Sequence, residues 1–107
     1  MSDANDAIEF LYKQAPKYAQ AKADRVFIEE FRKSKKALLM KSSRETTSAA
    51  QERDAYASQE YIDLLDGLKQ AIEIEVTLMW QLEAAKLRIE VYRTESANNR
   101  FLEKATQ

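Results

Sequence analysis

The sequence predicts an all-α fold, an antiparallel helical hairpin with one very long C-terminal helix that assembles into an oligomeric helical bundle. The chain of 107 residues contains one Gly and one Pro, so tight turns, β-hairpins and glycine-rich phosphate loops are disfavoured. Ala, Glu, Lys, Leu, Arg and Gln dominate the composition, and these residues lose least on entering a helix. A surplus of apolar residues in the C-terminal half favours assembly.

The N-terminal half of the single predicted helical domain contains two helices. Residues 1–15 form a short helix, and a second helix covers residues 16–41. Proline is favoured at the first helical position and disfavours helix in the residue before it, so Pro16 marks this boundary. A kink in one continuous helix is the alternative. Residues 42–48 are polar and lack hydrophobic periodicity, and they predict a loop.

The third predicted helix is the longest and covers residues 49–97. Ser48 followed by Gln51 matches a capping box, in which the two side chains satisfy backbone N–H groups at a helix start. Thr46 and Thr47 are alternative caps. The sequence therefore predicts that the long helix begins directly after the polar loop.

Nothing within this segment predicts a clear break. Gly67 is its only weak position, at about 1 kcal/mol relative to Ala. The alternation of apolar and polar residues from Ile72 to Leu78 is typical of a strand, but no second strand is available to pair its backbone groups. Asn98 and the Asn that follows it are the first natural stop, which leaves residues 98–107 as a tail.

The predicted hairpin has arms of unequal length. An antiparallel arrangement about the loop places Arg25 opposite Leu65 and exhausts the second helix at about Ile74. Apolar side chains beyond this point would form an exposed patch larger than monomers tolerate, and a second copy is the simplest cover. The predicted oligomer interface consists of Leu78, Met79, Trp80, Leu82, Ala85, Ile89 and Tyr92.

Two apolar stripes along the long helix favour a bundle over a simple two-stranded coiled coil. The first stripe follows a 3-4 spacing that Glu75 interrupts. It contains Leu64, Leu68, Ala71, Leu78, Leu82, Ala85, Ile89 and Tyr92. The second contains Leu65, Ile72, Val76 and Met79. A symmetric dimer is the simplest assembly, and a tetramer also fits.

A cluster of cations precedes and enters the loop. Six positive charges fall within thirteen residues without an acidic residue among them, and they predict a patch for nucleic-acid phosphates or a protein partner. They are Arg32, Lys33, Lys35, Lys36, Lys41 and Arg44. The structural alternative is that cations suit a helix C-terminus and that Glu52, Asp54 and Glu60 neutralise them. No aromatic residue interleaves them, so a base-stacking platform is not expected.

The composition does not favour catalysis or a cofactor. The chain has no His and no Cys, and its formal net charge is −1. A Ser or Thr nucleophile therefore lacks a histidine base, and disulfide and thiolate chemistry is not available. Glu73, Glu75, Glu83 and Glu90 lack the histidines of a carboxylate-bridged metal site. We expect no enzymatic activity, no metal and no cofactor.

The same composition indicates the compartment. No apolar run reaches the roughly 20 residues that a membrane span needs. The first six residues are acidic and polar, unlike a signal peptide. We therefore expect a cytosolic protein without a membrane partner.

Two segments resemble a known group of proteins: residues 29–40, EEFRKSKKALLM, and residues 78–100, LMWQLEAAKLRIEVYRTESANNR. With the motifs AYA at residues 55–57 and EY at residues 60–61, they resemble small helical proteins of tailed bacteriophages and prophages, from about residue 20 onward. The motifs carry no catalytic residue. Such proteins often lie among early replication and recombination genes, so the resemblance implies an accessory role in phage DNA metabolism in the bacterial cytoplasm.

Two functions follow as expectations. The first is a non-catalytic assembly or adaptor protein that acts by self-association and by binding another protein, whose identity the sequence does not give. The alternative is an accessory DNA-binding protein of phage replication or recombination, which touches phosphates with its basic hairpin tip.

Overall fold

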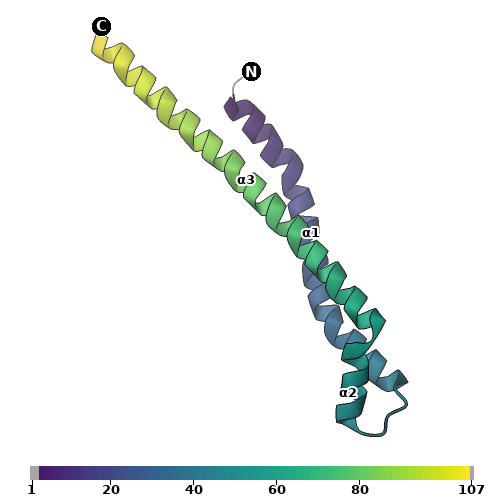
Figure 1. Cartoon of the computed structure of the whole chain (residues 1–107). Helices are drawn as coiled ribbons and strands as arrows, with labels where there is room; N and C mark the ends of the chain where they lie inside the picture. Colours follow the sequence, from purple (N-terminus) through teal and green to yellow (C-terminus); the bar gives the residue numbers. More distant parts are fainter. Residues whose placement is uncertain (1–2, 107) are drawn as a thin grey trace. The chain divides into compact units, whose positions relative to one another are not determined.

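The structure, a computed structural model, describes residues 3–106; Met1, Ser2 and Gln107 lie outside the described residues. The described residues form three α-helices and no strand: α1 (Asp3–Ser42), α2 (Ser48–Ala57) and α3 (Gln59–Thr106) (Figure 1). The all-α fold and the very long C-terminal helix are confirmed, since α3 contains 48 residues. No helix in this range is long and apolar enough to cross a membrane.

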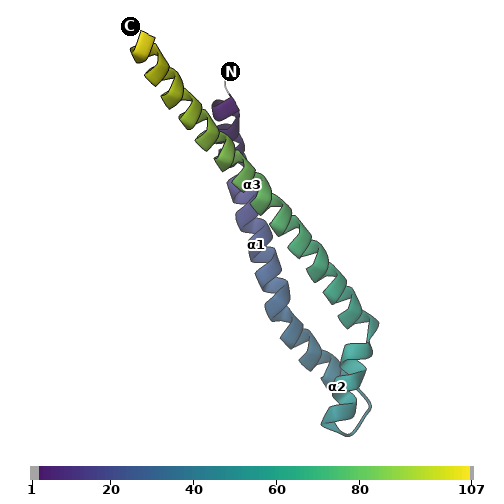
Figure 2. The same ribbon diagram turned by 60° about the vertical axis from the view of Figure 1, so that its left-hand side comes forward.

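The chain forms two compact units, one from Met1–Ala19 and Val76–Gln107, the other from Gln20–Glu75. In the second unit the chain runs along α1 to the loop, turns through α2 and returns along α3, as Figure 2 shows. Ion pairs between Arg25 and Glu75 and between Lys35 and Glu60 confirm that α1 and α3 are antiparallel in this unit.

Pro16 lies inside α1 rather than at the start of a second helix, so the predicted boundary between residues 1–15 and 16–41 is wrong. Proline lacks the N–H that would bond the carbonyl four residues earlier, at a cost of about 3 kcal/mol. Packing on both sides of the proline offsets this cost, because Ala7 is buried in the first unit and Ala21 in the second. The alternative of one continuous helix is the one observed.

The loop between α1 and α2 covers residues 43–47 and is one residue shorter at each end than predicted. Thr47 has an extended backbone, and its side chain accepts a hydrogen bond from the backbone N–H of Ala50 at 3.2 Å. The side chain of Gln51 donates to a loop carbonyl instead. The capping box predicted for Ser48 is therefore wrong, and the alternative cap, Thr47, is confirmed.

Ser58 separates α2 from α3. Its backbone is extended, with φ −69° and ψ 146°. Its hydroxyl donates to the carbonyl oxygen of Ala55 at 2.8 Å and accepts from the backbone N–H of Tyr61 at 3.2 Å. One side chain thus closes α2 and caps α3. The single helix predicted for residues 49–97 is wrong at its start, and Gly67 does not break α3.

The predicted C-terminal tail is also wrong, because α3 continues through Asn98 and Asn99 to Thr106. Each Asn costs at most about 0.7 kcal/mol relative to Ala in a helix interior. Both are exposed, so their amides interact with water without disturbing any packing.

Small side chains occupy the most buried positions of the helix pairs. Ala4, Ala7 and Ala85 are buried in the first unit, and Ala21 and Ala55 in the second. Small residues let two helix backbones approach closely, but they enclose little apolar volume. No large side chain of the described residues is fully buried, so the packing is a seam between helices rather than a layered core.

Replacing Gly67 with Ala should stabilise the protein. Gly67 has a helical backbone, and an added Cβ would meet nothing within 4 Å. Ala loses less entropy than Gly, so the free energy of unfolding should rise by roughly 0.5–1 kcal/mol. Thermal unfolding, monitored by circular dichroism, measures this change in the free energy of unfolding. The control Ala23→Gly, at an exposed position within α1, should change stability by a similar amount in the opposite direction. A loss of stability in Gly67→Ala would contradict the open surroundings of Gly67.

Candidate functional site

The seam of the second unit contains a bidentate ion pair. Nε and Nη2 of Arg25 donate to Oε2 and Oε1 of Glu75 at 2.7 and 2.9 Å. Nη1 of the same guanidinium donates to Oε2 of Glu29 at 2.9 Å. Glu75 is only 8% exposed, the one buried charged residue of the described chain. Its carboxylate is satisfied by the planar guanidinium, which matches its geometry.

This pairing shifts the acidity of both partners. The hydrogen bonds from Arg25 hold the pKa of Glu75 below its ordinary value, although burial acts in the opposite direction. The hydrogen bonds to Glu75 and then to Glu29 raise the pKa of Arg25. Both groups therefore stay ionised at neutral pH, and the pair is held by charge as well as by geometry.

The Arg25–Glu75 pair corrects the predicted register. The sequence predicted Leu65 opposite Arg25, ten positions from the observed partner. The prediction treated α2 and α3 as one straight helix, whereas Ser58 interrupts them. Sequence reasoning therefore missed the pair, although Glu75, as a charge inside an apolar stripe, was the signal that an opposite charge must face it.

The predicted oligomer interface is partly covered within the chain. Ala85 is buried, and Leu78, Met79, Leu82 and Ile89 are half-buried. Ala7 and Phe10 of α1 line a hollow together with Ala85 in the same unit. Trp80 and Tyr92 are the two members that remain exposed. As an interface between copies, the set stays a prediction.

The second apolar stripe of α3 is more open than the first. Leu65, Ile72 and Val76 are exposed, and Met79 is half-buried. Of the first stripe, only Tyr92 is exposed. The seam with α1 therefore uses one side of α3 and leaves much of the neighbouring apolar side in contact with water.

The predicted basic patch divides into paired and unpaired cations. Nζ of Lys35 lies 2.6 Å from Oε2 of Glu60, and Nζ of Lys36 lies 3.0 Å from Oε1 of Glu52. Lys33 pairs more loosely with Glu30 of its own helix. Glu52 and Glu60, two of the three carboxylates predicted to neutralise the patch, therefore do so.

The third carboxylate, Asp54, accepts a hydrogen bond from the hydroxyl of Ser43 instead. Three of the six cations of the patch form no ion pair within residues 3–106. These three, Arg32, Lys41 and Arg44, are all exposed. The free positive charge near the loop is therefore half of what the sequence alone suggested.

Lys36 is held more firmly than the other lysines of the patch. Its ammonium lies 4.8 Å from the ring centroid of Tyr56, a cation–π distance. Contact with the Tyr56 side chain, followed by the hydrogen bond to Glu52, raises the pKa of Lys36 above its ordinary value. Tyr56 also meets the ring of Tyr61 edge to face, with centroids 5.1 Å apart. Lys36 therefore helps fasten α2 to α1.

A small groove lies between α1 and α3 in the second unit, with a volume of about 350 Å³. Gly67 and Ala71 line it from α3, and Ile28 and Phe27 from α1. Phe27 is 67% exposed, and its ring stacks on that of Phe31 at 5.9 Å. The groove is a second apolar surface that the chain itself leaves open.

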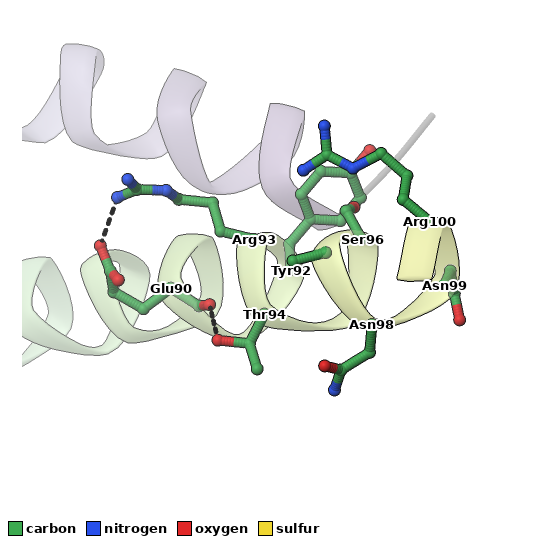
Figure 3. A pocket seen from close by; sticks show the side chains of 9 residues that line it. Glu90, Tyr92, Arg93, Thr94, Ser96, Asn98, Asn99 and Arg100 are labelled. Atoms are coloured by element: carbon green, nitrogen blue, oxygen red, sulfur yellow. Dashed lines mark hydrogen bonds and ion pairs between the residues drawn. The ribbon is translucent and has the colours of Figure 1, made fainter. Parts of the chain in front are cut away.

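The hollow near the C-terminus does not resemble a ligand site. All its lining residues come from one stretch of α3, residues 90–100, and Figure 3 shows their polar groups pointing in different directions around the helix. Arg93 pairs with Glu90 at 2.9 Å, and the Thr94 hydroxyl donates to the Glu90 carbonyl. Within residues 3–106 no group of three or more potential ligands is placed to hold a metal ion.

Removing one partner of the Arg25–Glu75 pair should destabilise the protein strongly. Arg25→Leu leaves a buried carboxylate without its cation, and Glu75→Leu leaves the guanidinium without its main acceptor. Each single variant should lower the thermal midpoint by several degrees or more. The double variant extends the apolar seam, so its midpoint should return to that of the wild type or exceed it. If the double variant lost as much stability as the two single variants together, the two side chains would not interact.

The ion pair should also make stability depend on pH. Because the folded pKa of Glu75 lies below its ordinary value of 4.5, its contribution is complete above about pH 4.5 and is lost as the pH falls through the lowered value. The stability difference between wild type and Glu75→Gln should therefore be large at pH 7 and shrink at pH 3. Glu73→Gln, at an exposed carboxylate of the same helix, should show a small difference at both pH values. A wild-type advantage that grows on acidification would contradict the assignment.

In comparisons with family models, curated proteins and solved structures, nothing matched this chain.

Proposed function

We propose that this chain is a non-catalytic helical assembly or adaptor protein that acts by self-association and by binding another protein. The observation that carries the proposal is the exposure of its apolar side chains. Seventeen large hydrophobic residues are exposed within the described range. No large side chain in the same range is fully buried. Scattered exposed apolar residues are normal on a protein surface, but α3 alone carries eleven of the seventeen, and such a concentration on one helix is typical of a protein–protein interface.

The total surface supports the same conclusion. The chain exposes 8365 Å², whereas a compact monomer of its mass, 12.4 kDa, exposes about 6100 Å². The surplus of roughly 2200 Å² is comparable to the area that one subunit buries in a large permanent interface. Association with further copies would remove this surplus from water.

The setting that we propose rests on the sequence resemblance. Small helical proteins of tailed phages supply the context of phage DNA metabolism in the cytoplasm of a bacterial host. The absence of Cys from the sequence fits a reducing compartment. In that setting a self-associating helical protein without catalytic residues would serve as a scaffold for one partner protein.

Light scattering after size-exclusion chromatography tests the proposal. The protein should elute at micromolar concentration with the mass of a dimer or a tetramer. A multiple of the 12.4 kDa chain mass is expected because each added copy covers apolar surface. A folded, helical species of 12.4 kDa that persists at 100 μM would contradict self-association.

A second candidate function, accessory DNA binding, is favoured by one observation. Arg32, Lys41 and Arg44 are exposed near the hairpin tip without an ion pair in the described chain. These three cations of the patch, multiplied by assembly, would give a surface that attracts phosphates. The net charge of −1 means that this attraction would be local.

The DNA hypothesis predicts a binding affinity that falls steeply with salt. Changing Arg32, Lys41 and Arg44 to Gln should weaken binding to duplex DNA and reduce the slope of log K against log salt by up to about 3 per copy. Fluorescence anisotropy from 50 to 200 mM salt measures both. A control that changes Lys13, which is paired with Glu9 on its own helix, should have little effect. Absence of binding at 50 mM salt would exclude this function.

A further inference from the structure

The outer side of α3 in the first unit carries a stripe of four large apolar side chains. Val76, Trp80, Leu87 and Val91 are exposed to 40%, 65%, 64% and 56%. They are separated by four, seven and four residues, so on an α-helix they fall within roughly 60° of one another around the axis. The buried Ala85 lies between them in sequence but on the seam side of α3.

The spacing of this stripe is symmetric. Its midpoint lies between Glu83 and Ala84, with Trp80 and Leu87 at equal distances on either side and Val76 and Val91 farther out. A twofold interface requires that a residue which contacts a second one in the other copy is itself contacted in return. An antiparallel pair of α3 helices meets this requirement, because Trp80 then faces Leu87 of the second copy and Leu87 faces its Trp80. A large ring opposite a smaller side chain also interdigitates well.

The size and charge of the stripe suit a second copy. Its four side chains expose roughly 400 Å² of apolar surface per copy, about half of the 800 Å² that each partner buries in a standard interface, and such interfaces are a little over half apolar. At the centre, Nζ of Lys86 lies 3.0 Å from Oε1 of Glu83. The twofold axis would therefore bring together two carboxylates and two ammonium groups, a balanced set rather than a row of like charges.

We propose that two copies of this chain associate through antiparallel pairing of their α3 helices, with Val76, Trp80, Leu87 and Val91 as the contact stripe and the twofold axis between Glu83 and Ala84. This inference rests on the proposed self-association and specifies the surface and the orientation. The contact lies on a different side of α3 from most of the interface predicted from sequence, with which it shares Trp80.

Charge insertion tests the surface. Leu87→Glu places a carboxylate against Trp80 of the other copy twice in each dimer, so the dimer dissociation constant should rise at least tenfold, measured by sedimentation equilibrium. Leu38→Glu is a matched control, because Leu38 is also an exposed leucine, at 57%, but lies on α1 in the second unit. Its dissociation constant should match that of the wild type. Circular dichroism establishes that both variants remain helical.

Distance measurements test the orientation with labels placed outside the stripe. The chain has no Cys, so a single cysteine at Gln81 or at Asn98, both exposed, can carry a unique spin label. Antiparallel pairing predicts a short distance between the two labels at residue 81, because the two positions are then only about five residues apart along the helices. At residue 98 it predicts about 44 Å, because the two positions are then separated by 29 residues of helical rise. Parallel pairing would give short distances at both positions.

The outcomes separate this inference from the proposed function. A monomeric wild type would overturn both. A wild-type oligomer that Leu87→Glu leaves intact, or short distances at both labelled positions, would overturn the antiparallel α3 contact alone and leave self-association standing. Dissociation by Phe27→Glu but not by Leu87→Glu would assign the contact to the groove of the second unit and would also overturn the inference. Two results together would support the antiparallel contact: Leu87→Glu dissociates the dimer, and the label distance is short at the central position but long at residue 98.

Discussion

The structure depends on one constraint: in each compact unit a long helix packs mainly against one other, and such a contact buries only one stripe of each. The residues in closest contact are small, above all Ala7, Ala21 and Ala85. Larger apolar side chains keep one side in water. Since the apolar surface removed from water is the main source of folding free energy, a chain with so little enclosed volume gains little stability alone. Burial of the exposed apolar stripes against another chain would therefore add to the stability of the folded state.

The Arg25–Glu75 pair has a different role in this arrangement. A buried ion pair contributes little net stability, because the loss of hydration offsets most of the attraction between the charges. Because Glu75 is buried, its carboxylate is satisfied only when Arg25 faces it, so the pair favours one register of α1 against α3 in the second unit. The pairs of Lys36 with Glu52 of α2 and of Lys35 with Glu60 of α3 act in the same way nearer the loop. Charges therefore fix the register that alanines and leucines leave open.

Composition and periodicity were sufficient to predict the all-α fold, the very long C-terminal helix and the loop to within one residue at each end. They failed where one side chain decides between two backbone paths. Ser58 breaks the helix with two hydrogen bonds to neighbouring backbone groups, and no repeat pattern signals this. Pro16 carries a strong local preference that packing on both sides overrides. The Arg25–Glu75 contact could not be found because it depends on the register, and the register depends on the Ser58 break. Exposure of Trp80 and Leu87 likewise required knowing which stripe faces α1.

The proposed self-association implies that the folded state of this chain is stabilised by contacts between copies. The most direct test is the dependence of the thermal unfolding midpoint on protein concentration, followed by circular dichroism from 1 to 100 μM. Because association of folded chains shifts the folding equilibrium by mass action, the midpoint should rise steadily with concentration. A midpoint that stays constant over this range, with full helicity at the lowest concentration, would show that the single chain is stable by itself and would contradict the claim.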